Sequence, residues 1–183
     1  MYGAQDMKQR NILFLIIVIA VSTITVIGCS RKEKGRYYND EYGFSIVFPK
    51  YWEIQQKEMG TAVVALSPEE GSRDDFRENV AITVEDVSDG ETLEKYFVVS
   101  QQNLKSYSKD YMLLYKNNTW LSRKPAMILG FTYSMSGLKL KVLQYYCLYK
   151  NKAYVITCTA LPHTFDRYEE IFLKIVRTFR FEK

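Results

Sequence analysis

The chain has 183 residues, of which 47% are hydrophobic, 15% aromatic and 25% charged. These values are those of a globular protein with one domain of ordinary size and a short targeting segment. The formal net charge is +4, but residues 1–28 carry +1 of it and residues 30–36 carry +3, so the chain from Tyr37 onward is neutral. A neutral domain lacks the electrostatic footprint of a nucleic-acid-binding protein, and we expect no nucleic-acid partner.

The N-terminal segment has the order of an export signal. Lys8 and Arg10 precede ten apolar residues at 12–21, as a basic region precedes an apolar one in secretory signals. The apolar run ends in Val-Ile-Gly-Cys at 26–29, which resembles the lipobox of bacterial lipoproteins.

The lipobox resemblance implies that Cys29 carries a lipid. The thiolate of this Cys takes up the diacylglyceryl group, and the small Gly28 before it lets the signal peptidase approach and cleave between Gly28 and Cys29. We therefore expect a lipoprotein signal peptide at 1–28, a lipidated basic tether at 29–36 and a domain at 37–183. Acyl chains such as palmitate would then hold the protein on the extracytoplasmic face of a bacterial membrane, in contact with membrane lipid.

Other interpretations of this segment stay open. Residues 12–28 are seventeen in number, at the lower edge of what spans a bilayer, so an uncleaved membrane anchor is one alternative and ordinary secretion another. The Cys directly after the apolar run, followed by charged residues, favours the lipoprotein. The basic stem suits either a solvated tether or attraction to anionic headgroups, at about 1 kcal/mol per basic residue near the surface.

Strand-like runs fill the first part of the domain. The fifteen Tyr and ten Phe favour strands in general, because aromatic side chains suit a pleated, half-buried surface. Apolar alternation and flanking turn residues predict strands at 44–48, 52–57, 61–66 and 79–87, with a charged loop at 67–77.

A first helix is predicted after Asp89-Gly90, with Thr92 as its N-cap. Its apolar stripe repeats every three or four residues, which is typical of a surface helix that lies on a sheet. The stripe consists of Leu93, Tyr96, Phe97, Ser100, Leu104 and Tyr107.

Four further strands are predicted at 111–116, 126–135, 139–149 and 153–160. Short turns at Ser136-Gly137 and at 150–152 join the last three, and their length predicts an antiparallel meander. A second helix is expected to begin near Thr164, with an apolar face of Phe165, Tyr168, Phe172, Ile175, Val176 and Phe179.

These residues carry a family resemblance. Gly-Phe-Ser-Ile at 43–46, followed by Phe48-Pro49 and Trp52, resembles the opening strand of PsbP-like domains. The closing helix and Thr-Phe-Arg-Phe at 178–181 resemble the end of the same domains, so the resemblance runs from about Tyr37 to Phe181. It implies an α+β fold, an antiparallel sheet flanked by helices in an α/β/α sandwich. Members of the family mostly bind partners and do not run reactions, and no binding residue transfers.

Sequence motifs for catalysis or metal binding are missing. A hydrolase would need His163, the only His, as its base with Asp166 three residues on, and no Gly-x-Ser-x-Gly motif is present. We therefore predict no catalytic residue, no metal site and no cofactor. The acidic residues of the charged loop are interspersed with Arg, which favours a solvated loop over a weak Ca²⁺ site. They are Glu69, Glu70, Asp74 and Asp75.

Cys147 and Cys158 remain once Cys29 is lipidated. Export permits a disulfide, but the predicted hairpin places Cys147 opposite residue 154 or 156, diagonal to Cys158 and too far for an unstrained bond. Two buried free thiols are expected.

The sequence thus predicts a membrane-tethered, non-catalytic binding or accessory module for an envelope protein complex. A carrier or sensor of a small apolar ligand is the alternative, and an enzyme is third. An exposed aromatic patch on the sheet or beside the first helix would support the accessory role. An enclosed cavity between sheet and helix would support the carrier.

Overall fold

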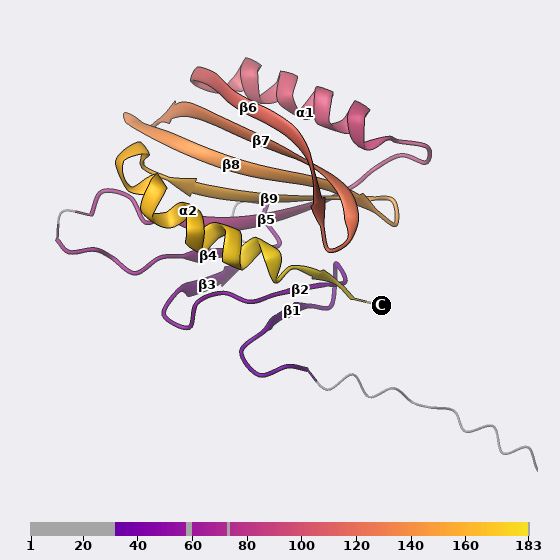
Figure 1. Ribbon diagram of the computed structural model, residues 1–183, viewed down its shortest axis with the longest axis horizontal. Helices are drawn as coiled ribbons and strands as arrows, with labels where there is room; N and C mark the ends of the chain where they lie inside the picture. The colour runs from indigo at the N-terminus through magenta and orange to yellow at the C-terminus, as the bar shows by residue number, and fades with distance from the viewer. Residues whose placement is uncertain (1–31, 58–59, 73, 183) are drawn as a thin grey trace, which may run out of the picture. The chain divides into compact units, whose positions relative to one another are not determined.

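The computed structural model describes residues 32–57, 60–72 and 74–182 (Figure 1). Gly28 and Cys29, and with them the predicted signal peptide, lie outside the described residues. The elements in chain order are β1 (Tyr37–Asn39), β2 (Phe44–Ile46), β3 (Glu53–Gln56), β4 (Val63–Leu66), β5 (Asn79–Asp86), α1 (Leu93–Tyr107), β6 (Lys109–Leu121), β7 (Lys124–Met135), β8 (Leu138–Tyr149), β9 (Lys152–Ala160), α2 (Pro162–Arg177) and β10 (Arg180–Phe181).

A seven-stranded antiparallel sheet in the order β3-β4-β5-β9-β8-β7-β6 forms the centre of the domain. Along β9, Tyr154 and Ile156 belong to the core beneath α2, whereas Val155 belongs to the core beneath α1. Because neighbouring residues of a strand point to opposite faces, the two helices cover opposite faces of the sheet (Figure 1). The predicted α/β/α sandwich is confirmed.

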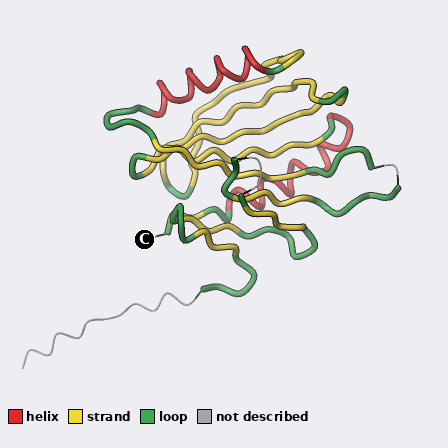
Figure 2. The backbone as a smooth tube through the Cα atoms, turned by 180° about the vertical axis from the view of Figure 1, so that it is seen from behind, coloured by secondary structure: helices red, strands yellow, loops and turns green. Residues whose placement is uncertain are grey.

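A smaller antiparallel sheet, in the order β1-β2-β10, joins the two ends of the domain. Figure 2 shows its short strands beneath those of the main sheet. The sequence predicted the strand that begins at Phe44, and the family resemblance implied a short strand at the C-terminal end. Neither β1 nor the pairing of the two ends was predicted. The pairing brings the first described residues next to the last.

The meander β6-β7-β8-β9 turns through three two-residue loops. Both loop residues have positive φ in each: Ser122 and Arg123, Ser136 and Gly137, Lys150 and Asn151. This is the type I′ geometry that matches the twist of hairpin strands. The turn at 122–123 was not predicted, since neither residue is the Gly, Asn or Asp that this geometry favours, and β6 is accordingly longer than the predicted 111–116.

The two helices differ in how firmly they pack. Thr92 caps α1 as predicted, accepting a hydrogen bond from the backbone of Lys95, but Phe97 is the one residue of α1 that is fully buried. Tyr107, predicted to lie in the apolar stripe, is instead 87% exposed at the last position of the helix. Helix α2 begins at Pro162, two residues earlier than predicted, and buries five side chains.

Candidate functional site

The edge strand β6 exposes an unusual amount of apolar surface. It is the last strand of the main sheet, so one side of it has no neighbouring strand among the described residues. Met112, Leu113, Leu114 and Tyr115 follow one another along it, and each is at least 38% exposed. Exposed apolar edge strands attract other chains, and soluble proteins usually protect them.

Two register shifts interrupt the pairing of β6 with β7. Leu113 lies opposite Phe131 and Tyr115 opposite Gly130, so Leu114 is the extra residue of a bulge. A second shift falls between Lys109 and Met112. Bulges twist a strand away from regular pairing, so this part of β6 suits contact through side chains better than the addition of another strand.

A groove of about 600 Å³ runs between α1 and the bulged part of β6. We call it the edge groove. Apolar side chains line it together with two glutamines and two cations, Lys105 and Lys116. Its lining is Val98, Gln101, Gln102, Lys105, Tyr111, Met112, Leu113 and Lys116.

The chemistry of the edge groove is that of a binding surface. No His, Cys or carboxylate is found among the described residues that line it. Burial raises the pKa of the Tyr111 hydroxyl, which has no hydrogen-bond partner among the described residues, so this group stays neutral at ordinary pH. The groove therefore offers apolar contact, amide hydrogen bonding and positive charge.

His163 and Asp166, the candidate catalytic residues, share no hydrogen bond or ion pair among the described residues. His163 is exposed on the first turn of α2. Asp166 forms an ion pair with Lys141 on β8, with Nζ and Oδ1 3.3 Å apart. The structure thus brings the two into no catalytic arrangement.

The acidic loop is anchored on α2. The Tyr168 hydroxyl donates to Glu70 Oε1 over 2.7 Å, and Arg167 pairs with the other oxygen. These two hydrogen bonds, that of Tyr168 being the larger effect, lower the pKa of Glu70. Asp74 accepts a hydrogen bond from the backbone of Glu70 within the loop. The part of the chain that the structure describes holds no cluster of three or more metal-ligating side chains.

Cys147 and Cys158 are free and buried, as predicted. Cys147 lies opposite Tyr154 in the β8–β9 register, and Cys158 lies opposite Leu143. Burial raises the pKa of the Cys147 thiol to about 11 and raises the pKa of Cys158 as well. Both thiols are therefore protonated and unreactive at neutral pH.

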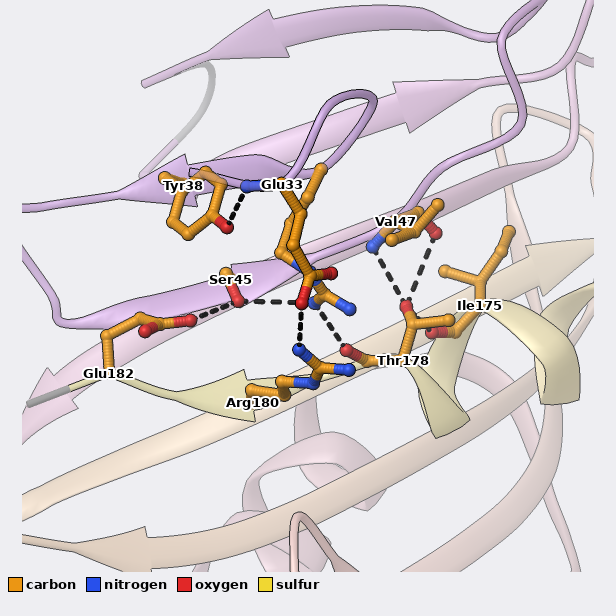
Figure 3. Close-up of polar contacts among 9 residues, drawn as sticks. Glu33, Tyr38, Ser45, Val47, Ile175, Thr178, Arg180 and Glu182 are labelled. Carbon is orange, nitrogen blue, oxygen red and sulfur yellow. Dashed lines mark hydrogen bonds and ion pairs between the residues drawn. The ribbon is translucent and has the colours of Figure 1, made fainter. Parts of the chain in front are cut away.

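The end of the predicted stem is fixed against the domain (Figure 3). The Arg36 side chain is only 4% exposed and donates to the carbonyl of Thr178 over 2.7 Å and to Glu33 over 3.1 Å. Arg180 on β10 donates to the other oxygen of Glu33 over 2.7 Å. The hydrogen bonds from Arg180 and then Arg36 lower the pKa of Glu33. We call this set, with the Ser45–Glu182 hydrogen bond beside it, the stem network.

Within the described residues, no helix combines the length and apolarity needed to cross a bilayer.

The domain has the fold of PsbP-like proteins. It matches the solution structure of the cyanobacterial PsbP protein (CyanoP) of Synechocystis with a TM-score of 0.61 and 14% identity, over 80% of this chain and 91% of that one. It matches LpqN of Mycobacterium tuberculosis, described as involved in cell envelope biogenesis, with a TM-score of 0.66 and 12% identity, over 81% and 90%.

The yeast Ran-binding protein Mog1p is also similar, with a TM-score of 0.53 and 9% identity, over 80% of this chain and 94% of that one. No family model and no curated protein matches the sequence. At such low sequence identities, the structural similarity to these proteins shows a shared fold and nothing more.

Proposed function

We propose that this protein is a lipid-anchored, non-catalytic accessory module of the bacterial cell envelope, and that its edge groove binds a partner protein. The exposed apolar surface of β6 beside α1 is the observation that carries the proposal. A patch of this kind is what an interface needs in its centre, since aromatic residues and Met are enriched there and charge is depleted. The involvement of the similarly folded LpqN in envelope biogenesis supports the cellular setting.

The partner's contact surface follows from the groove. Apolar side chains of the partner would pack against Met112 and Leu113, which line the groove. Carboxylates beside them would face Lys105 and Lys116, neither of which forms an ion pair within the described domain. Charge complementarity of this kind gives specificity and speeds association.

The shape of the groove favours a protein over a small ligand. A carrier of a small apolar molecule encloses most of its ligand's surface, whereas Met112 and Leu113 are 48% and 41% exposed. Proteins bury such open apolar surface when they associate.

Co-purification from membranes tests the proposal. The tagged wild type is compared with Leu113→Asp, which places a charge in the groove, and with Ile54→Asp. Ile54 lies on β3, the opposite edge strand, and is 43% exposed, so it matches Leu113 in chemistry and exposure. We expect a stoichiometric partner that Leu113→Asp weakens at least tenfold and Ile54→Asp leaves bound.

The variant Cys29→Ala tests the anchor in the same experiment. It should shift the protein out of the membrane fraction or stall its processing, and lose the partner. Unchanged fractionation of Cys29→Ala would contradict the lipid anchor. Equal loss of the partner in Leu113→Asp and Ile54→Asp, or no partner with the wild type, would contradict the role of the edge groove.

A further inference from the structure

A second hollow, of about 790 Å³, lies where the β6–β7 turn meets the end of α2 and β10. We call it the basic hollow. Four cationic side chains line it: Arg123, Lys124, Arg177 and Arg180. No acidic side chain is among its lining residues in the described chain. In a domain whose net charge is zero, this is a local concentration of positive charge.

Three of these four charges have no carboxylate partner. Arg180 pairs with Glu33 in the stem network. Within the described residues Arg123, Lys124 and Arg177 form no ion pair. Like charges held near each other repel, so their arrangement is stabilised when an anion binds between them.

Ring contacts and a hydrogen bond hold the elements around the basic hollow together. The ring of Tyr149 packs on that of Phe181, with centroids 4.4 Å apart, and Lys124 Nζ lies 5.0 Å from the centre of the Tyr149 ring. The backbone N–H of Phe181 donates to the Ser122 hydroxyl over 3.3 Å. The β6–β7 turn is thereby tied to β10, and its cations are positioned in advance.

Arg123 occupies a strained position in this turn. Its φ is +65°, in the left-handed region where Gly and Asn are favoured and other side chains cost about 1–2 kcal/mol. Asn at this position would keep the turn conformation while removing the charge.

The rim of the basic hollow carries Trp120, whose side chain is 70% exposed. An exposed indole next to several cations is the combination found where proteins meet a bilayer. Trp prefers the headgroup level, and basic side chains attract anionic lipids there.

The stem network places the basic hollow at the point where the chain leaves the domain toward Cys29. Glu33, which pairs with Arg180 of the hollow, follows Cys29 by four residues. Four residues of chain span at most about 14 Å. If Cys29 carries a lipid, as the proposed function holds, the tether begins beside this surface.

We propose that the basic hollow binds the phosphate of an anionic phospholipid headgroup. The cations then hold the phosphate and Trp120 lies at the headgroup level of the membrane. The domain is thereby oriented on the bilayer, instead of hanging freely from its anchor. Of the proposed function, the inference uses only the lipid anchor and does not depend on the edge groove.

Vesicle binding of the unlipidated protein tests the inference. The chain from residue 29 onward with Cys29→Ala serves, because the compact unit Lys32–Lys183 contains both core clusters. It is mixed with vesicles of phosphatidylcholine alone or with added phosphatidylglycerol. We expect binding only to the second kind, with a blue shift of tryptophan fluorescence that Trp120→Phe abolishes. Trp120 is the reporter because Trp52, the other of the two Trp residues, is buried.

Two matched triple variants locate the binding. The first combines Arg123→Asn, Lys124→Gln and Arg177→Gln, where Asn suits the left-handed turn position. It should weaken binding on the order of a hundredfold. The second removes three exposed charges elsewhere and should change binding much less. It combines Lys50→Gln, Lys95→Gln and Lys139→Gln.

Three outcomes would overturn the inference. Equal weakening in both triple variants would mean diffuse attraction without a site. Binding of inorganic phosphate or of single-stranded DNA that depends on these cations, with no binding to phosphatidylglycerol vesicles, would mean a different anion. No vesicle binding at all would remove the membrane contact, and it would leave the edge groove and its partner untouched.

Discussion

Gly130 on β7 shows how a single position accommodates a large side chain on the neighbouring edge strand β6. It lies opposite Tyr115 in the β6–β7 register. A Cβ at Gly130 would lie 2.5 Å from the Cε1 atom of the Tyr115 ring, closer than real contacts allow. The missing side chain lets the ring lie over the neighbouring strand, and the bulge at Leu114 stands next to it.

We therefore predict that Gly130→Ala destabilises the domain by about 1–3 kcal/mol, the usual cost of overpacking. Urea unfolding measures this change. The same substitution in a Tyr115→Ala background should cost much less, since the ring is gone. An equal cost in both backgrounds would show that the ring is not what Gly130 accommodates.

For single residues, the sequence predicted which side chains lie opposite each other wherever this depends on one hairpin. The β8–β9 turn fixed the register, and the register excluded a Cys147–Cys158 bond. The sequence did not reveal that Gly130 lies opposite Tyr115, because apolar alternation locates a strand but does not identify the strand that pairs with it. Nor did it reveal the buried Arg36, whose partner Thr178 lies 142 residues away.

The loop at 67–77 and helix α2 lie far apart in the chain and are joined by hydrogen bonds. Glu70 receives hydrogen bonds from Tyr168 and Arg167, and its pKa lies below the usual 4.5. A carboxyl whose pKa is lower in the folded than in the unfolded protein stabilises the fold above its ordinary pKa. That stabilisation is lost as the pH falls through the lower, folded value.

We predict that Glu70→Gln lowers the urea midpoint of unfolding at pH 7, and that the difference from wild type shrinks as the pH falls below the usual Glu pKa. The effect should be modest, since the pair is partly exposed. Glu69→Gln, the neighbouring acidic residue, is the control and should change the midpoint less. A pH-independent difference for Glu70→Gln would show that its charge does not anchor the loop.

Among the elements, periodicity predicted the helices and the inner strands of the meander well. It failed at β6, which was predicted at 111–116 and extends over Lys109–Leu121. Bulges broke the alternation on which the prediction relied, and the turn at Ser122 and Arg123 lacks the usual turn residues. The consecutive apolar residues Met112, Leu113 and Leu114 were the one available signal of an exposed edge.

The two candidate surfaces lie at different places on the domain. The edge groove lies between α1 and β6, and the basic hollow lies where the β6–β7 turn meets α2 and β10. The sequence predicted the sandwich and a neutral domain, but net charge does not locate cations that folding gathers from the β6–β7 turn and the C-terminal end of α2. The two surfaces would allow the domain to contact a bilayer and a protein at once.

Site-specific photocrosslinking in intact membranes shows whether a partner protein docks in the edge groove. A photoreactive amino acid is placed at Met112 on β6 or at Ile54 on β3, two positions of similar exposure on opposite edges of the sheet. We expect one discrete crosslinked protein at Met112 and none at Ile54. The same product at both positions, or at Ile54 alone, would contradict this docking.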